Sequence, residues 1–76
     1  MKKLKKIMSF YTTADALETE DILISFGYFG RLIPVPRNMS AGCGLAFEMD
    51  ISIYNQIPEN ILNSLPEFEQ ITEMYL

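Results

Sequence analysis

Residues 45–51 show the clearest alternation of hydrophobic and polar positions in the chain. Successive side chains of a strand point to opposite faces, so alternate residues share a face. One predicted face carries large apolar side chains and the other carries small or acidic ones: Leu45, Phe47, Met49 and Ile51 against Ala46, Glu48 and Asp50. We therefore predict a strand over these residues.

Three further strands are predicted from weaker patterns. Residues 6–12 are mostly apolar or β-branched, and residues 68–75 alternate loosely. Residues 31–35 also predict a strand, but Pro34 and Pro36 have no N–H group to donate. That strand should therefore lie at an edge of the sheet, with both prolines facing outward.

A helix is predicted between the first two strands. Thr12 is its expected N-cap, and Asp15 follows at the spacing of a capping box. Negative charge near this end also suits the helix dipole. The helix should run to about Phe26 and stop at Gly27. Its apolar stripe should consist of Ala16, Leu17, Leu23 and Ile24.

A second helical region is predicted after the strand at 45–51, with Ser52 as a candidate cap. Pro58 interrupts the helical pattern, so we expect a helical turn over 53–56 and a helix that starts near Pro58. Pro66 should end this helix. The shared apolar face would consist of Tyr54, Ile57, Ile61 and Leu65.

The predicted order of elements is β-α-β-β-α-β in a single domain, residues 1–76. Two crossovers around a central hairpin favour a ferredoxin-like α+β sandwich, with an antiparallel sheet of order 4-1-3-2. Both helices should then cover one face of the sheet. The other face should be open, with Tyr11, Ala46 and Tyr75 on it. An exposed patch of this kind would favour a homodimer.

Composition narrows the classes of function. The formal net charge is −4, and four of the six basic residues gather at the start, where we expect a solvated, frayed terminus: Lys2, Lys3, Lys5 and Lys6. The acidic remainder argues against binding to nucleic acid, and no apolar run is long enough to span a membrane. With one cysteine and no histidine, we expect no disulfide, no metal and no cofactor. A lone thiol fits a reducing, cytoplasmic location.

The loop that follows the proline-containing strand concentrates the candidate chemistry. It holds the single cysteine, Cys43, between Gly42 and Gly44, with Arg37 and Ser40 a few residues before it. A thiol reacts as its thiolate, which cations, helix N-termini and clustered backbone N–H groups all favour. We predict that these four neighbours stabilise an anion at Cys43.

The predicted topology also places this cysteine. The first and second strands run in the same direction, so the first helix starts at the end of the sheet where the loop emerges. We therefore expect Cys43 to lie close to Thr12 and Thr13, exposed to water at the loop tip. The opposing interpretation is that Cys43 is a small buried hydrophobic residue, since free cysteine is often buried.

Two sequence stretches add a resemblance. Residues 31–37 read Arg-Leu-Ile-Pro-Val-Pro-Arg, and residues 40–46 read Ser-Ala-Gly-Cys-Gly-Leu-Ala. Together with residues 12–17, they resemble the selenium/sulfur carrier-like family of small bacterial proteins, which is described mainly as a domain of unknown function. The resemblance spans most of the chain and implies a carrier cysteine, here Cys43. The chain departs from the family at Pro58, where members have an uninterrupted charged helix.

The favoured function is that of a sulfur or selenium carrier. Cys43 would hold a persulfide or selenosulfide and pass it from a donor protein to an acceptor protein. No general base accompanies the cysteine, so the sequence does not favour a thiol-dependent enzyme. The alternative is an anion-sensing or protein-interaction module in which the cysteine is not catalytic, because a fold alone does not choose a function.

Overall fold

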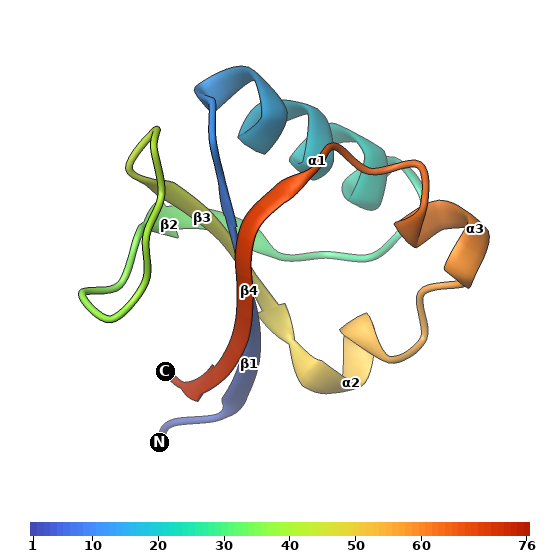
Figure 1. The fold of residues 1–76 in the computed structure, drawn as a ribbon. Coiled ribbons are helices and arrows are strands. Elements are labelled where there is room, and N and C mark those ends of the chain that lie inside the picture. Colours follow the sequence, from blue (N-terminus) through green and yellow to red (C-terminus); the bar gives the residue numbers. More distant parts are fainter.

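The computed structural model describes all of residues 1–76 as a four-stranded sheet with the helices on one face (Figure 1). Along the chain the elements are β1 Leu4–Phe10, α1 Thr13–Ser25, β2 Arg31–Pro34, β3 Leu45–Asp50, α2 Ile51–Tyr54, α3 Glu59–Leu62 and β4 Phe68–Tyr75. No helix is both long enough and apolar enough to cross a membrane.

The strands are arranged β2-β3-β1-β4, and all three pairings are antiparallel. Read from the β4 edge, this order is 4-1-3-2. The predicted α+β class and the antiparallel sheet are therefore confirmed. β2 is an edge strand, as its prolines required, and Pro34 is exposed opposite Leu45 of β3.

The second crossover does not supply the second long helix of the predicted ferredoxin-like sandwich. Two short helices replace it, α2 directly after β3 and α3 directly after Pro58 (Figure 1). The start near Pro58 was predicted, but α3 ends at Leu62 instead of continuing to Pro66, because the chain tightens into turns. There the N–H groups of Ser64 and Leu65 bond to carbonyls three residues back. The predicted cap at Ser52 is also wrong, since Asp50 precedes α2 and Ser52 lies inside it.

The start of α1 agrees with the predicted cap. The Thr12 hydroxyl accepts a hydrogen bond from the Asp15 N–H at 3.1 Å. At the other end, Phe26 caps the helix, and Gly27 turns the chain with a φ of 87°, in the left-handed region that favours glycine.

The buried stripe of α1 differs from the predicted one. Ala16, Thr19 and Leu23 are buried, whereas Leu17 and Ile24 are 48% and 38% exposed. Positions 16, 19 and 23 follow the helical spacing of three and four, which places them in one line against the sheet. Leu17 and Ile24 lie one step further around the helix, so the prediction that they belong to the buried stripe was wrong.

The main core lies between the helices and one face of the sheet. Its buried members come from the central strands, from α1 and from the α2–α3 connection: Met8, Phe10, Phe47, Met49, Ala16, Leu23 and Ile57. Phe68 at the start of β4 packs edge-to-face against Phe10, with the ring centroids 5.6 Å apart. This contact joins the last strand to the core.

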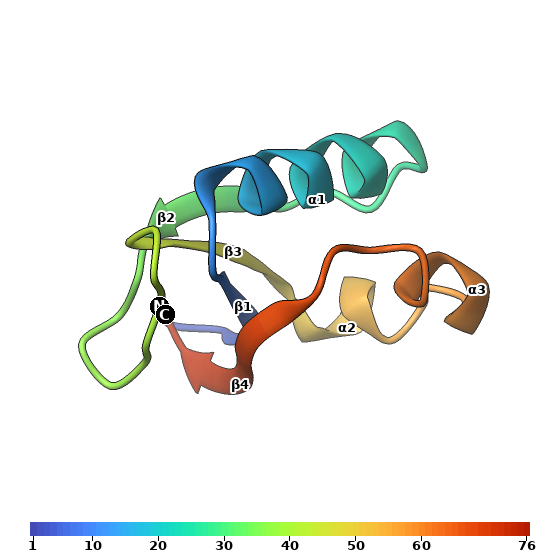
Figure 2. The same cartoon turned by 45° about the horizontal axis from the view of Figure 1, so that its top comes forward.

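The opposite face of the sheet is not open, contrary to the prediction. The loop between β2 and β3 extends from the sheet on the side away from α1 (Figure 2). Met39 of this loop packs against Ile7 and Ala46, which are both fully buried. Tyr11, also predicted on this face, is exposed in the connection between β1 and α1. Tyr75 is exposed, but it pairs with Leu4 of β1, in phase with Met8, and so lies on the helical side of the sheet. The three residues predicted to form a patch on the open face therefore do not share that face.

The lysine-rich start is also more ordered than predicted. Lys5 and Lys6 belong to β1, and each of them forms an ion pair with a carboxylate. The Lys3 N–H donates to the Leu76 carbonyl at 3.0 Å, and the Leu76 N–H donates back to Lys3. The two ends of the chain are therefore paired rather than frayed.

Replacing the cap residue by Thr12→Ala should lower the free energy of unfolding by about 1 kcal/mol, because the Asp15 N–H would lose its acceptor. Urea unfolding followed by circular dichroism measures this change. Thr13→Ala is the matched control, since Thr13 is an exposed residue within the first turn and its hydroxyl caps nothing. An equal loss in both variants would contradict the assignment of Thr12 as the cap.

Candidate functional site

The candidate site is built on the loop that connects β2 to β3. At its base, the Val35 N–H donates to the Gly44 carbonyl at 3.0 Å, which extends the pairing of the two strands. Gly44 has a φ of 77°, in the left-handed region that favours glycine. Its N–H donates to the Ala41 carbonyl and closes a turn around Cys43. Cys43 therefore lies near the base of the loop, and the prediction that it is exposed at the tip was wrong.

Three hydrogen bonds fix the loop to strands that are distant in the sequence. The Ser9 hydroxyl of β1 donates to the Ser40 carbonyl at 2.5 Å. The Ser40 N–H donates to the side-chain carbonyl of Gln70, and the Gly42 N–H donates to the carboxylate of Glu69, both at 2.7 Å. Because β1 and β4 both contribute, the position of the loop depends on the assembled sheet.

Cys43 is half-buried and packs against the core on the helical side of the sheet. Its sulfur lies 3.5 Å from the Phe10 carbonyl and 3.7 Å from the Leu45 carbonyl, and either can accept the thiol proton. The Leu45 N–H donates to the same sulfur at 3.4 Å. The thiol is thus surrounded by main-chain groups, two of which can accept its hydrogen bond and one of which donates to its sulfur.

The cysteine lies beside the start of α1, as the topology predicted. Phe10, whose carbonyl faces the sulfur, precedes the N-cap Thr12 by only two residues, or about 7 Å of extended backbone. Gly42 packs directly on the residue between them. A Cβ atom at Gly42 would lie 2.8 Å from the Tyr11 carbonyl oxygen, so only glycine allows this close approach.

The four other predicted site residues, Arg37, Ser40, Gly42 and Gly44, do not all contact the sulfur of Cys43. Arg37 is exposed in the loop and forms no hydrogen bond or ion pair with the chain. Ser40 contributes its main-chain groups, which hold the loop to the sheet. The N–H groups of Gly42 and Gly44 are both engaged, by Glu69 and by Ala41. In this conformation the N–H that reaches the sulfur is that of Leu45.

Three residues that hold the loop were not identified from the sequence: Ser9, Glu69 and Gln70. Ser9 carried a signal, since it is a small polar residue within an apolar run and is fully buried. A buried hydroxyl needs a partner. Glu69 and Gln70 were interpreted only as part of a predicted strand, because nothing local shows which loop will lie beside them.

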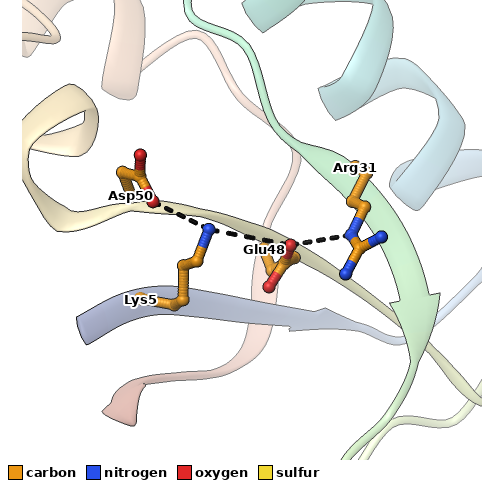
Figure 3. Close-up of polar contacts among 4 residues, drawn as sticks. All are labelled: Lys5, Arg31, Glu48 and Asp50. Atoms are coloured by element: carbon orange, nitrogen blue, oxygen red, sulfur yellow. Dashed lines mark hydrogen bonds and ion pairs between the residues drawn. The ribbon is translucent and has the colours of Figure 1, made fainter. Parts of the chain in front are cut away.

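A second polar cluster lies on the sheet face opposite the helices (Figure 3). The Glu48 side chain is only 6% exposed, and its carboxylate accepts a hydrogen bond from Nε of Arg31 at 2.8 Å. The Lys5 ammonium lies 4.0 Å from the same oxygen and 2.7 Å from Asp50. Two cations therefore neutralise a carboxylate that would be costly to bury alone.

Two hollows lie on the surface, and Cys43 lines neither of them. One, of about 310 Å³, adjoins the charged cluster and includes Phe29 and Gly30. The other, of about 350 Å³, lies between the loop and β4 and is lined by Asn38, Met39, Gln70, Ile71 and Thr72. No group of three or more His, Cys, Asp or Glu side chains is arranged to hold a metal ion.

The comparisons with known proteins give one match. A model of the family described as Putative Se/S carrier protein-like matches residues 5–73. No curated protein and no solved structure matches the chain. The matched residues include β1 except for Leu4, the cysteine loop and the first six residues of β4, so they contain the three hydrogen bonds that hold the loop to β1 and β4.

The charged cluster gives the chain a predictable response to acid. The hydrogen bond from Lys5 holds the pKa of the Asp50 carboxyl below its usual range, although desolvation opposes the shift. The stabilisation is therefore present above the pKa of an unfolded aspartate, about 3.9, and is lost as the pH falls through the lower, folded value. Asp50→Asn should be less stable than the native chain at pH 7.

The difference in stability between Asp50→Asn and the native chain should disappear in acid, below the folded pKa of Asp50. Urea unfolding across the acid range measures it. Asp21→Asn is the control, because Asp21 is an exposed residue of α1 without an ion pair, and its difference should not change with pH. A stability difference for Asp50→Asn that stayed constant into acid would contradict the role assigned to the Lys5–Asp50 pair.

The bond between Glu69 and the Gly42 N–H should limit access to Cys43. Glu69→Ala removes it, so the loop should open more often, and alkylation of the thiol by iodoacetamide should become severalfold faster. Glu67→Ala is a matched control, because it removes the same charge from an exposed residue that is not bonded to the loop. Equal acceleration in both variants would show that charge, and not the loop contact, controls the rate.

Proposed function

Since the chain belongs to the family described as Putative Se/S carrier protein-like, we propose that it carries a sulfur or selenium atom on Cys43. The observation that carries this proposal is that the matched residues contain one cysteine, which is held in a defined position beside the start of α1. Every other residue with a role in the proposal acts on this thiol or on the loop that holds it.

The proposed transfer conserves atoms and electrons. The Cys43 thiolate attacks the terminal sulfur of a persulfide on a donor protein, so that a new bond forms between Sγ and that sulfur. The sulfur–sulfur bond of the donor breaks, and the electron pair leaves with the donor thiolate. An acceptor thiolate then repeats the exchange and releases Cys43. A selenosulfide would follow the same course, with selenium as the transferred atom.

The main chain around Cys43 supports an anionic intermediate in part. The Leu45 N–H already donates to the sulfur. Arg37 is unpaired and exposed, so it remains available as a cation for the terminal sulfur or selenium, and Ser40 offers a hydroxyl. Using the Gly42 N–H would require displacement of the Glu69 carboxylate, which occupies it. Gly44, whose N–H bonds to Ala41, would likewise have to be released from its turn.

A donor must also reach the sulfur. Cys43 is half-buried, and its sulfur lies within hydrogen-bond distance of the carbonyl groups of Phe10 and Leu45. Loading therefore requires a movement of the loop, and the bonds from Ser40 and Gly42 to β4 are the ones that such a movement would break. The proposed carrier is thus closed at rest and opens at its partner. The lone thiol further favours a reducing compartment such as the cytoplasm.

One observation favours a second function. The sulfur packs against core residues and lines no hollow, as would suit a structural cysteine in an anion-sensing or protein-interaction module. The two functions differ in their response to Cys43→Ser. This variant should abolish transfer in a carrier, but it should leave binding unchanged in a module whose thiol is not used.

Incubation with a cysteine desulfurase and cysteine should add one sulfur atom to the chain, and a selenocysteine lyase with selenocysteine should add one selenium atom. Intact-mass spectrometry detects either addition, which dithiothreitol should reverse. Cys43→Ser should gain neither. If Cys43 remained unmodified in both reactions while iodoacetamide still alkylated it, the carrier function would be wrong.

A further inference from the structure

The two edges of the sheet differ in how well they are protected. β2 has only four residues and ends at Pro34, which has no N–H to offer at its edge, and Pro36 follows two residues later. β4 occupies the other edge with eight residues and contains no proline. Long, unprotected edge strands are uncommon because they readily pair with another chain. The structure thus blocks strand addition at β2 and leaves it open at β4.

The free edge of β4 can be followed residue by residue. Lys3 and Leu76 exchange two hydrogen bonds, so they form a hydrogen-bonded pair of the antiparallel ladder. Such pairs alternate along a ladder, which places the N–H and C=O groups of Ile71, Glu73 and Tyr75 on the outer side. β4 is the last strand of the sheet, and Ile71 and Tyr75 are 43% and 64% exposed, so no strand of the chain pairs with this edge.

A hollow of about 350 Å³ adjoins the same edge, between β4 and the loop. Gln70 and Thr72 line it from the strand, and Asn38 lines it from the loop. The side-chain carbonyl of Asn38 and the hydroxyl of Thr72 can each accept a hydrogen bond, whereas the Gln70 oxygen already accepts one from the Ser40 N–H. A strand beside β4 would point alternate side chains towards this hollow, and a lysine or arginine would find these acceptors there.

The charge of β4 indicates which kind of strand could pair with its free edge. The strand contains Glu69 and Glu73 and no basic residue, and Glu67 directly precedes it. A second copy paired antiparallel about Ile71 would place Glu69 opposite Glu73, and like charges opposite one another are destabilising. A basic strand would instead place positive charge beside these carboxylates, of which Glu73 already pairs with Lys6 of β1 and Glu69 already accepts the Gly42 N–H.

We propose that β4 binds an extended, lysine- or arginine-rich segment of a partner protein as a fifth strand of the sheet. Main-chain hydrogen bonds to Ile71, Glu73 and Tyr75 would supply affinity, and one basic side chain in the hollow would supply selectivity. Because Glu69 and Gln70 also hold the cysteine loop, the segment would lie next to the loop that must open. The docking site itself does not require that Cys43 transfer sulfur.

A blocked peptide of alternating lysine and valine, eight residues long like β4, is the probe. It should bind the native chain by fluorescence anisotropy, and amide NMR signals of Ile71, Glu73 and Tyr75 should shift. The same peptide with alternate N-methyl groups keeps its charge but cannot pair along one edge. Its affinity should be at least about tenfold lower, since several hydrogen bonds are lost.

A matched pair of variants tests the protein side. Ile71→Pro removes one outward N–H and leaves the bonds to β1, so it should weaken peptide binding by about tenfold, whereas Ile71→Ala should retain it. Cys43→Ser should bind the peptide as the native chain does, which separates this proposal from sulfur transfer. If Ile71→Pro does not fold, the N-methylated peptide still decides.

Three results would overturn the proposal. They are failure of the probe to bind, equal binding of the N-methylated peptide, and a native dimer in sedimentation that Ile71→Pro dissociates. The second result would reduce the interaction to charge attraction. The third would identify another copy of the chain as the occupant of the edge.

Discussion

The structure depends on the packing of one loop against the sheet. The loop between β2 and β3 places Met39 on Ile7 and Ala46, and three hydrogen bonds hold it to β1 and β4. A sheet with helices on one face must otherwise expose its second face to water. Here the loop provides part of the missing layer. In a chain of 76 residues, where the core is small, this contact adds a second cluster of three buried residues to the seven of the main core.

The same loop carries the single cysteine, so its packing and its chemistry are coupled. The contacts that hold the loop place Cys43 beside the Phe10 carbonyl, half-buried and close to the start of α1. A movement that exposes the sulfur must break bonds to β4, while Met39 can keep the loop tip attached to the sheet. The edge strand that holds the loop is also the one with unpaired main-chain groups, so the proposed partner segment and the cysteine loop would lie on neighbouring residues.

The second face of the sheet has an apolar part and a charged part. The loop covers the apolar part, and the cluster of Lys5, Arg31, Glu48 and Asp50 occupies the rest (Figure 3). Glu48 alternates with apolar neighbours in β3, so its position on the face opposite the helices follows from strand geometry. Strand geometry does not explain how the Glu48 carboxylate is neutralised, because Lys5 comes from β1 and Arg31 from β2. Burial of this carboxylate is tolerated because pairing of three strands brings both cations to it.

The amino-acid sequence by itself determined the local elements and their class. Alternation in β3, the cap at Thr12, the edge position of β2 and the break at Pro58 all depend on residues within a few positions of one another. Tertiary structure decided which stripe of α1 is buried, the covering of the second face and the position of Cys43. The last two of these features depend on contacts such as Ser9–Ser40 and Gly42–Glu69, which join residues about thirty positions apart. Local sequence patterns do not predict such contacts. They form only after hydrophobic burial and hydrogen bonding have brought the strands together.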